Sequence, residues 1–172
     1  VVVDNGSDAH TQDWLMKEYR HELIMLRQNR YPGFACNRGF EKAPTDASFL
    51  HRADNDFKFL PGWCEHVQRC FRRERLGQLG LRTDEEECFA KSNVGGNMII
   101  RRELWNEGLR YDERPWGEYP PGYSEDSYYS PEVVKLGWEW CRVWRPCIES
   151  PASGDLYDPY YQESYRKRGI LV

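Results

Sequence analysis

Two aspartates one residue apart give the clearest chemical signal in this sequence. Asp54, Asn55 and Asp56 follow an apolar run, Ser48 to Ala53, which predicts a β-strand that delivers both carboxylates into a loop. Hard divalent cations such as Mg2+ and Mn2+ take oxygen ligands, and they commonly bridge one or two carboxylates to substrate phosphates. Asp54 and Asp56 are therefore candidate metal ligands, although a bare D-x-D also occurs in ordinary solvated turns.

A second acidic pair stands at the start of a predicted helix. Ser124, Glu125 and Asp126 open a segment that runs to about Leu136, and Gly137 closes it. Acidic residues stabilise a helix start by interacting with its dipole. This interpretation explains both residues without any catalytic role.

A third polar cluster follows the β-branched run at the beginning of the chain. Val1 to Val3 predict a buried strand, and Asp4 and Asn5 begin the turn-rich segment after it. Ligands collect at the carboxyl ends of parallel strands. Asp4 and Asn5 can equally form an Asx-turn that ends the strand. Because a strand begins at residue 1, we expect that further chain precedes it.

Composition and length indicate one folded, acidic domain that covers residues 1–172. The sequence is 40% hydrophobic and 30% charged, with a net charge of −4 and no long basic run, so we expect no nucleic-acid partner. We find no apolar stretch of about 20 residues and no signal-peptide pattern, and expect a cytoplasmic protein without a transmembrane segment. The six cysteines form no C-x-x-C pair, which argues against a zinc ribbon. Free thiols are expected, although an even count also allows disulfides.

The remaining patterns predict an α/β fold in which helices flank a mainly parallel central sheet. An amphipathic helix is expected from Thr11 to Asn29, where Pro32 and Gly33 stop it. A short strand at Phe34 to Cys36 would lead into a loop, Asn37 to Asp46. The later elements, in chain order, are a helix at 63–75, a strand at 76–81, a strand at 97–100, a helix at 102–106, a long aromatic loop at 109–124, a strand at 139–144 and a helix at 157–168.

Five motifs in their order along the chain resemble glycosyltransferase family 2. They are V-V-V-D-N-G-S-D at 1–8, N-R-G-F at 37–40, A-D-N-D with P-G-W at 53–63, G-G-N-M-I-I-R-R at 95–102, and E-D at 125–126. The resemblance implies the A-type glycosyltransferase fold, known as GT-A, and a nucleotide-diphosphate sugar as donor. The opening strand and first helix of that fold have no counterpart before Val1.

The resemblance also implies roles for particular residues. Asp54 and Asp56 would hold the divalent cation, and Asp126 would be the general base with Glu125 as its neighbour. The implied nucleotide-binding residues are Asp4, Asn5, Arg38, Gly39 and Asp54. The implied sugar-binding turn is Gly95, Gly96 and Asn97. No histidine follows His66, so the late histidine ligand of some relatives has no counterpart.

Aromatic residues around the second acidic pair, Trp116 among them, are candidates for stacking on a sugar acceptor or for core packing. We therefore predict an inverting, metal-dependent transfer of a sugar from a UDP- or GDP-sugar to a hydroxyl acceptor. The alternatives are a retaining transferase of the same fold, a non-catalytic carbohydrate-binding module, and a metal-dependent nucleotidyltransferase or phosphohydrolase.

Overall fold

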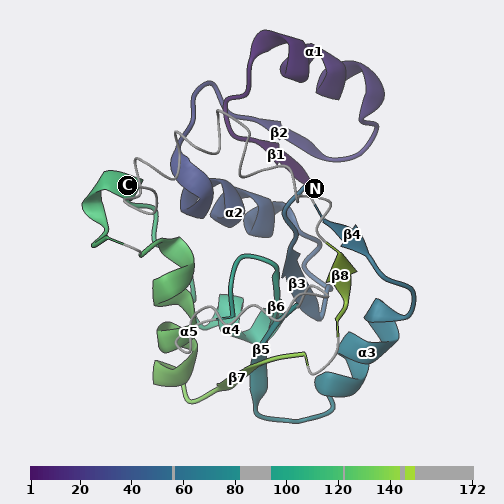
Figure 1. Ribbon diagram of the computed structural model, residues 1–172, viewed down its shortest axis with the longest axis vertical. Helices are drawn as coiled ribbons and strands as arrows, with labels where there is room; N and C mark the ends of the chain where they lie inside the picture. Colours follow the sequence, from purple (N-terminus) through teal and green to yellow (C-terminus); the bar gives the residue numbers. More distant parts are fainter. Residues whose placement is uncertain (56, 82–93, 122, 144–145, 150–172) are drawn as a thin grey trace.

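A four-stranded mixed sheet forms the centre of the molecule. The computed structural model describes residues 1–55, 57–81, 94–121, 123–143 and 146–149 (Figure 1). In spatial order the sheet contains β3 (Phe49–Arg52), β6 (Met98–Arg101), β5 (Leu76–Gly80) and β7 (Glu139–Arg142). β6 runs antiparallel to both of its neighbours, whereas β5 and β7 are parallel. The predicted α/β class is confirmed, but the central sheet is mixed where a mainly parallel one was expected.

Both faces of this sheet are covered, and the side chains of β6 alternate between them. Met98 and Ile100 belong to one apolar core cluster, with Leu104 and Val133, while Ile99 belongs to the other. Figure 1 shows the helices α5 (Glu125–Lys135) and α3 (Trp63–Cys70) on opposite sides of the sheet. An apolar strand without polar alternation is what a doubly covered sheet requires.

A smaller N-terminal unit lies beside this sheet, at the top of Figure 1. It consists of α1 (Ala9–Glu18) and two parallel strands, β1 (Val2–Asp4) and β2 (Leu23–Met25). The helix expected from Thr11 to Asn29 is therefore wrong in its second half, because the segment around Ile24 pairs with β1. Its expected packing on the sheet is also wrong, since α1 buries no residue and Trp14 is 57% exposed.

The next segment corrects two further predictions. Residues expected to form a short strand and a loop form the helix α2 (Tyr31–Lys42). Pro32 and Gly33 lie in its first turn and do not end a preceding helix. Proline fits there because the first amide groups of a helix have no acceptor within it. Tyr31 enters the helix with a φ of 66°, in the left-handed region.

The remaining elements agree with the predicted positions. Strands were predicted at β3, β5, β6 and β7, and helices at α3, α5 and α4 (Arg102–Asn106). The loop before α5 contains a short 3-10 helix, η1 (Trp116–Glu118), and β4 (Lys58–Phe59) pairs antiparallel with β8 (Ile148–Glu149). The helix predicted at 157–168 lies outside the described residues.

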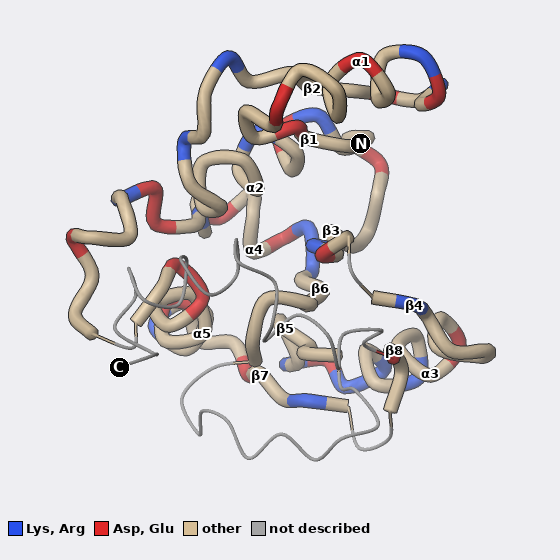
Figure 2. Tube along the Cα trace, turned by 45° about the horizontal axis from the view of Figure 1, so that its top comes forward, with Lys and Arg blue, Asp and Glu red and all other residues tan. Residues whose placement is uncertain are grey.

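The expectations about the cysteines and about a membrane-spanning segment can be compared with the described residues. Cys36, Cys64 and Cys141 are free thiols there, and Cys88 lies outside them. In the same part of the chain no helix has the length and apolar character needed to cross a membrane. Figure 2 shows Lys and Arg interspersed with Asp and Glu along the fold.

Candidate active site

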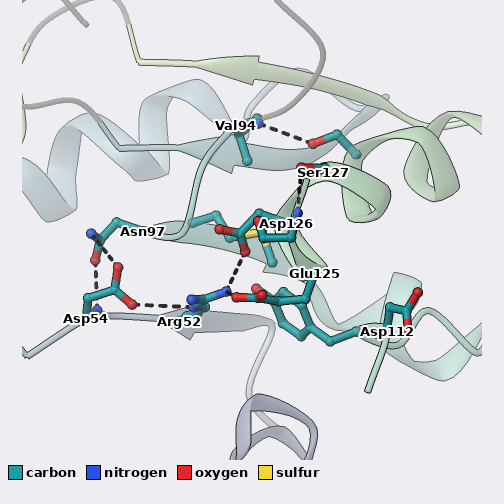
Figure 3. A network of polar contacts seen from close by, with 12 residues as sticks. Arg52, Asp54, Val94, Asn97, Asp112, Glu125, Asp126 and Ser127 are labelled. Carbon is teal, nitrogen blue, oxygen red and sulfur yellow. Dashed lines mark hydrogen bonds and ion pairs between the residues drawn. The ribbon is translucent and has the colours of Figure 1, made fainter. Parts of the chain in front are cut away.

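A partly buried arginine contacts three carboxylates where β3 ends and α5 begins (Figure 3). Arg52 Nη1 lies 2.5 Å from Asp126 Oδ1 and 3.2 Å from Glu125 Oε1, and Arg52 Nε lies 3.4 Å from Asp54 Oδ1. We call these four residues the Arg52 cluster. It joins two of the acidic motifs predicted from the sequence, although 71 positions separate Asp54 from Glu125.

The start of α5 is well suited to hold two acidic side chains. The hydroxyl group of Ser127 accepts a hydrogen bond from the backbone N–H of Ser124, which completes a capping box at this end of the helix. Glu125 and Asp126 occupy the first helical turn, where the positive end of the helix dipole favours negative charge. The side chain of Glu125 is 4% exposed and that of Asp126 is 18% exposed. Asp126 is therefore the more accessible of the pair.

Asn97 fixes the orientation of Asp54. Its Oδ1 accepts a hydrogen bond from the backbone N–H of Asp54 at 2.9 Å, and its Nδ2 donates to Asp54 Oδ2 at 3.3 Å. The two residues meet because β3 and β6 are antiparallel neighbours, so the end of one strand lies beside the start of the other. Asn97, predicted to be near the sugar, thus contacts the predicted metal ligand.

Gly96 lies close to the carboxylates of Asp54 and Asp126. A Cβ at this position would lie 2.9 Å from Asp54 Oδ2, 3.4 Å from Arg52 Nη2 and 3.5 Å from Asp126 Oδ2. Gly95 has a φ of 82°, a conformation that favours glycine. In the G-G-N turn, glycine suits position 95 because of its backbone conformation. It suits position 96 because a side chain there would meet Asp54, Arg52 and Asp126.

Two stacked rings, Tyr111 and Tyr129, lie beneath the Arg52 cluster, and we call them its aromatic floor. The guanidinium carbon of Arg52 lies 5.3 Å from the centre of the Tyr111 ring, and that ring stacks on Tyr129 at 4.2 Å. Burial raises the pKa of Tyr111 well above its ordinary value, and burial raises the pKa of the nearby Cys36 thiol to about 12. These groups stay protonated at neutral pH, so the charge here resides in Arg52 and the carboxylates.

Asn37 anchors that floor from α2. Its Nδ2 donates to the backbone carbonyl of Tyr111 at 3.0 Å, and its Oδ1 accepts from the backbone N–H of the same residue at 2.9 Å. Asn37 is 2% exposed. The N-R-G-F motif therefore contributes to the site through its first residue, which supports the loop beneath Arg52.

Arg38 and Gly39 lie on α2, where the sequence predicted a loop close to the donor. Arg38 is ion-paired with Glu41 at 2.8 Å and lies 3.7 Å from Glu113. A Cβ on Gly39 would lie 3.3 Å from a methyl group of Val3, so this glycine allows α2 to pack closely on β1. The expected loop is corrected to a helix, and these contacts explain both residues by packing and surface charge.

Asp4 and Asn5 make their contacts within the turns around β1. Asp4 is 3% exposed and accepts hydrogen bonds from the backbone of Ser7 and the side chain of Gln12. Asn5 accepts from the backbone N–H of Arg30 at 2.9 Å. These are the turn-forming contacts that were the alternative to a nucleotide-binding role.

Two further residues were predicted for the site, Trp116 and Asp56. Trp116 lies in η1, with its ring centre 5.9 Å from that of Tyr31. Asp56, the second predicted metal ligand, lies outside the described residues. Among the described residues no group of three or more His, Cys, Asp and Glu side chains could hold a metal ion.

The donor set nevertheless fits a cation of the kind that shares its ligands with a substrate. The Arg52 cluster has three carboxylates for one guanidinium, so it carries an excess of negative charge. Mg2+ and Mn2+ need only one or two carboxylates when substrate phosphates and water complete the coordination. Asp54, whose Oδ2 lies beside Gly96, would be one of them.

Arg52 is the residue that the sequence patterns missed. It stands in β3 two positions before Asp54, and a charged side chain that is largely buried needs a partner. The charge within this predicted strand was the available signal. It did not identify the partners, two of which come from a helix more than 70 positions away.

Comparison with known proteins identifies the family. A family model described as glycosyl transferase family 2 matches residues 1–110. The chain belongs to this family. The match includes the D-x-D strand and the G-G-N turn, and it ends before the acidic pair of α5. No curated protein matches the chain significantly.

Solved structures confirm the A-type glycosyltransferase fold that the family implies. A mannosyltransferase from Pyrobaculum calidifontis, in complex with GDP-Man and Mn2+, has a TM-score of 0.69 and 14% identity over 96% of this chain and 50% of that one. TarS 1–349 from S. aureus, in complex with UDP-GlcNAc, has a TM-score of 0.62 and 14% identity, covering 86% and 48%. The catalytic domain of Drosophila β1,4-galactosyltransferase 7 with xylobiose has a TM-score of 0.55 and 17% identity, covering 92% and 71%.

The chain spans about half the length of the first two of these structures. At these identities the similarity establishes the fold. Function has to be argued from the site.

Proposed function

We propose that the chain forms the donor side of an enzyme that transfers a sugar from a UDP- or GDP-sugar to an acceptor hydroxyl group, with Mg2+ or Mn2+ and with inversion. The observation that carries the proposal is the Arg52 cluster. It brings the end of the D-x-D strand and the acidic start of α5 together, beside the G-G-N turn. Family membership supports the class of reaction.

Asp126 has the position that a general base requires. In the proposed step the acceptor oxygen forms a bond to the anomeric carbon while the bond from that carbon to the diphosphate breaks. The diphosphate leaves with the electron pair, and Asp126 takes the hydroxyl proton. Arg52 holds Asp126 Oδ1, and the side chain of Asp126 is 18% exposed. The carboxylate is therefore held in place and still partly exposed to solvent.

Asp54 and Asp56 are the residues that would hold the cation. When bound, the cation would offset the charge that develops on the leaving diphosphate. The contacts of Asp54 with Arg52 and Asn97 hold its carboxylate beside Gly96. The presence of Mn2+ with GDP-Man in the mannosyltransferase from Pyrobaculum calidifontis supports this part of the proposal by analogy.

The remaining donor and acceptor residues are proposed with the roles that the family pattern assigns. Asn5 fits a contact with the base or ribose better than Asp4, because Asp4 is almost fully buried. Arg38 and Gly39 would act from α2. Gly95, Gly96 and Asn97 would lie against the transferred sugar, and Trp116 against the acceptor.

Sugar transfer can be tested directly by incubating the chain with UDP-GlcNAc or GDP-Man, Mn2+ and a panel of monosaccharide acceptors. The proposal predicts release of UDP or GDP together with a glycosylated product. Asp126→Asn should lower turnover by about 100- to 10,000-fold, the usual contribution of a general base. Asp46→Asn is the matched control, because Asp46 is exposed in a turn before β3. The anomeric configuration of the product, read by NMR, separates inversion from retention.

Three results would contradict the proposal. Release of inorganic phosphate from a nucleotide would indicate a phosphohydrolase. Glycan binding that needs no metal and survives Asp54→Asn would indicate a carbohydrate-binding module. Equal turnover in the Asp126→Asn and Asp46→Asn variants would remove the general base from Asp126.

A further inference from the structure

Arg52 connects the two halves of the proposed site. It is the last residue of β3, and its three ion-pair partners come from the loop after β3 and from the first turn of α5. Nη1 points to both carboxylates of α5, while Nε points to Asp54. One planar guanidinium therefore sets the position of the candidate base relative to the candidate metal ligand.

The charge of Arg52 is permanent and strongly held. Its side chain is 12% exposed. Burial alone would lower the pKa of Arg52, but the charges of Asp126 and its other neighbours raise it well above the ordinary value. Glu125 Oε2 is buried with no hydrogen-bond partner among the described residues, so Arg52 is the group that compensates this carboxylate.

The surroundings of Arg52 restrict its motion. Tyr111 lies under the guanidinium, Tyr129 stacks against Tyr111, and Asn37 binds the backbone of Tyr111 through two hydrogen bonds. Such layered support is what holds a functional side chain in one geometry. Arg52 therefore has a fixed platform on one side and fixed carboxylate partners on the others.

We propose that Arg52 is a positioning residue for the transfer reaction. It holds Asp126 and Glu125 of α5 in register with Asp54 of the donor motif, so that the base faces the space in which the cation and the anomeric carbon would lie. This inference rests on the proposed function. A lysine cannot replace Arg52, because a single ammonium group lacks the rigid fork that contacts carboxylates in two directions.

The test compares Arg52→Lys with Arg102→Lys. Arg102 is also buried, at 9% exposed, but its guanidinium donates to the backbone carbonyls of Pro44 and Ala47. For each full-length variant, kcat and KM are measured with UDP-GlcNAc or GDP-Man and Mn2+, and the Kd of UDP or GDP with Mn2+ is measured by calorimetry. Arg52→Lys should lower kcat about 30- to 100-fold, the effect of a small misplacement of a reacting group. Nucleotide Kd should change by less than about threefold, and Arg102→Lys should change neither value by more than that.

Glu125→Gln provides a second variant in case Arg52→Lys does not fold. This substitution weakens the contact between Arg52 and Glu125 and leaves the guanidinium of Arg52 in place. It should therefore lower kcat and leave the nucleotide Kd unchanged. An unchanged kcat in both variants would overturn the inference. A nucleotide Kd that weakens in Arg52→Lys as much as kcat falls would also overturn it, because Arg52 would then bind the donor directly.

The wild-type chain separates failure of the inference from failure of the proposed function. If the wild type neither binds a nucleotide with Mn2+ nor cleaves either donor, the proposed function fails and the inference fails with it. If the wild type turns over and Arg52→Lys matches it, only the positioning role of Arg52 is refuted.

Discussion

At the scale of single residues, the site depends on one position that has no side chain. Gly96 lies between the carboxylates of Asp54 and Asp126, and an added methyl group would meet Asp54 Oδ2 at 2.9 Å. The clashing atom belongs to a side chain, so it can move, but only by weakening the contacts of Asp54 with Asn97 and Arg52. A methyl group here would therefore displace the candidate metal ligand while the backbone stays in place.

Gly96→Ala should accordingly weaken binding of UDP or GDP with Mn2+ by about tenfold or more, the effect of an overpacked contact costing 1–3 kcal/mol. The free energy of unfolding should fall by less than about 1 kcal/mol. Gly117→Ala is the matched control, because a Cβ at Gly117 would meet nothing within 4 Å. Calorimetry and urea denaturation give the two values, and unchanged nucleotide affinity in Gly96→Ala would contradict the placement of the donor.

His51 gives the fold a pH dependence of its own. Its ring lies among Phe59 and Trp63, with centres 5.5 and 5.6 Å away, and its Nε2 is buried without a partner among the described residues. Burial lowers the pKa of His51 to about 4, against the opposing charge of Asp54. The folded state therefore favours the neutral ring. The resulting stability is present above the unfolded pKa of about 6.5 and is lost as the pH falls toward 4.

We predict that acidification from about pH 7 to about pH 4.5 costs the wild type ~2 kcal/mol more than it costs His51→Gln. The measurement is urea denaturation of both proteins at both pH values. His10→Gln is the matched control, because His10 is exposed on α1. An equal loss of stability in the wild type and in His51→Gln would show that His51 does not titrate as its burial implies.

Residue patterns predicted part of the site and could not predict the rest. The motif order singled out Asp54, Asn97 and Asp126, which the structure brings together around Arg52 and Gly96, while their roles stay predictions. Arg52 was missed, since its partners depend on how β3 meets α5. Asp4 could not be assigned either, because an aspartate that closes a turn and one that binds a ligand follow a strand in the same way.

At the scale of elements, α2 is fitted to the loop beneath the site by two residues on one helical face. Gly33 and Asn37 are four positions apart, so they lie on the same side of the helix. A Cβ at Gly33 would lie 1.9 Å from the backbone carbonyl oxygen of Asp112, and Asn37 bonds to the backbone of Tyr111. The helix can approach this loop closely because position 33 has no side chain.

Gly33→Ala should therefore lower the free energy of unfolding by about 2–3 kcal/mol, the cost of a backbone clash in a packed region. The obstacle is backbone and cannot turn away, in contrast to the situation at Gly96. Urea denaturation measures the change, with Gly117→Ala again as the control. A stability equal to that of the wild type would contradict the close contact between α2 and residues 111–113.

The errors in the predicted elements have physical causes. Pro32 and Gly33 often end a helix, but a proline in the first turn starts one equally well, and the sequence does not distinguish the two cases locally. The apolar spacing from Thr11 to Asn29 favours one long helix. Pairing of Leu23–Met25 with β1 overrides that local preference, because it satisfies the backbone of both strands.

At the scale of the whole molecule, β6 links the two halves of the core. Ile100 belongs to the cluster under α4 and α5, and Ile99 belongs to the cluster under α3. Adjacent residues on one strand thus take part in both clusters. Loss of either cluster would leave a face of the same sheet uncovered, so we expect the two to unfold together.

Ile99→Ala and Ile100→Ala should each lower the free energy of unfolding by about 2–5 kcal/mol. In each variant, far-UV circular dichroism and tryptophan fluorescence should report one coincident transition, as expected for a single domain. Val134→Ala is an exposed control that should change stability by less than about 1 kcal/mol. Separate transitions for the two probes would divide the chain into independent units and contradict the shared core.

Binding of a nucleotide together with a metal ion tests the central claim most directly. The chain is titrated with UDP and with GDP, each with and without Mn2+, and the titration is repeated with Asp54→Asn and with Asp46→Asn. The account predicts that one nucleotide binds in the presence of Mn2+, that Asp54→Asn abolishes this binding, and that Asp46→Asn retains it. Binding that is indifferent to Mn2+ and to Asp54, or no binding of either nucleotide, would contradict the assignment of the Arg52 cluster as a donor site.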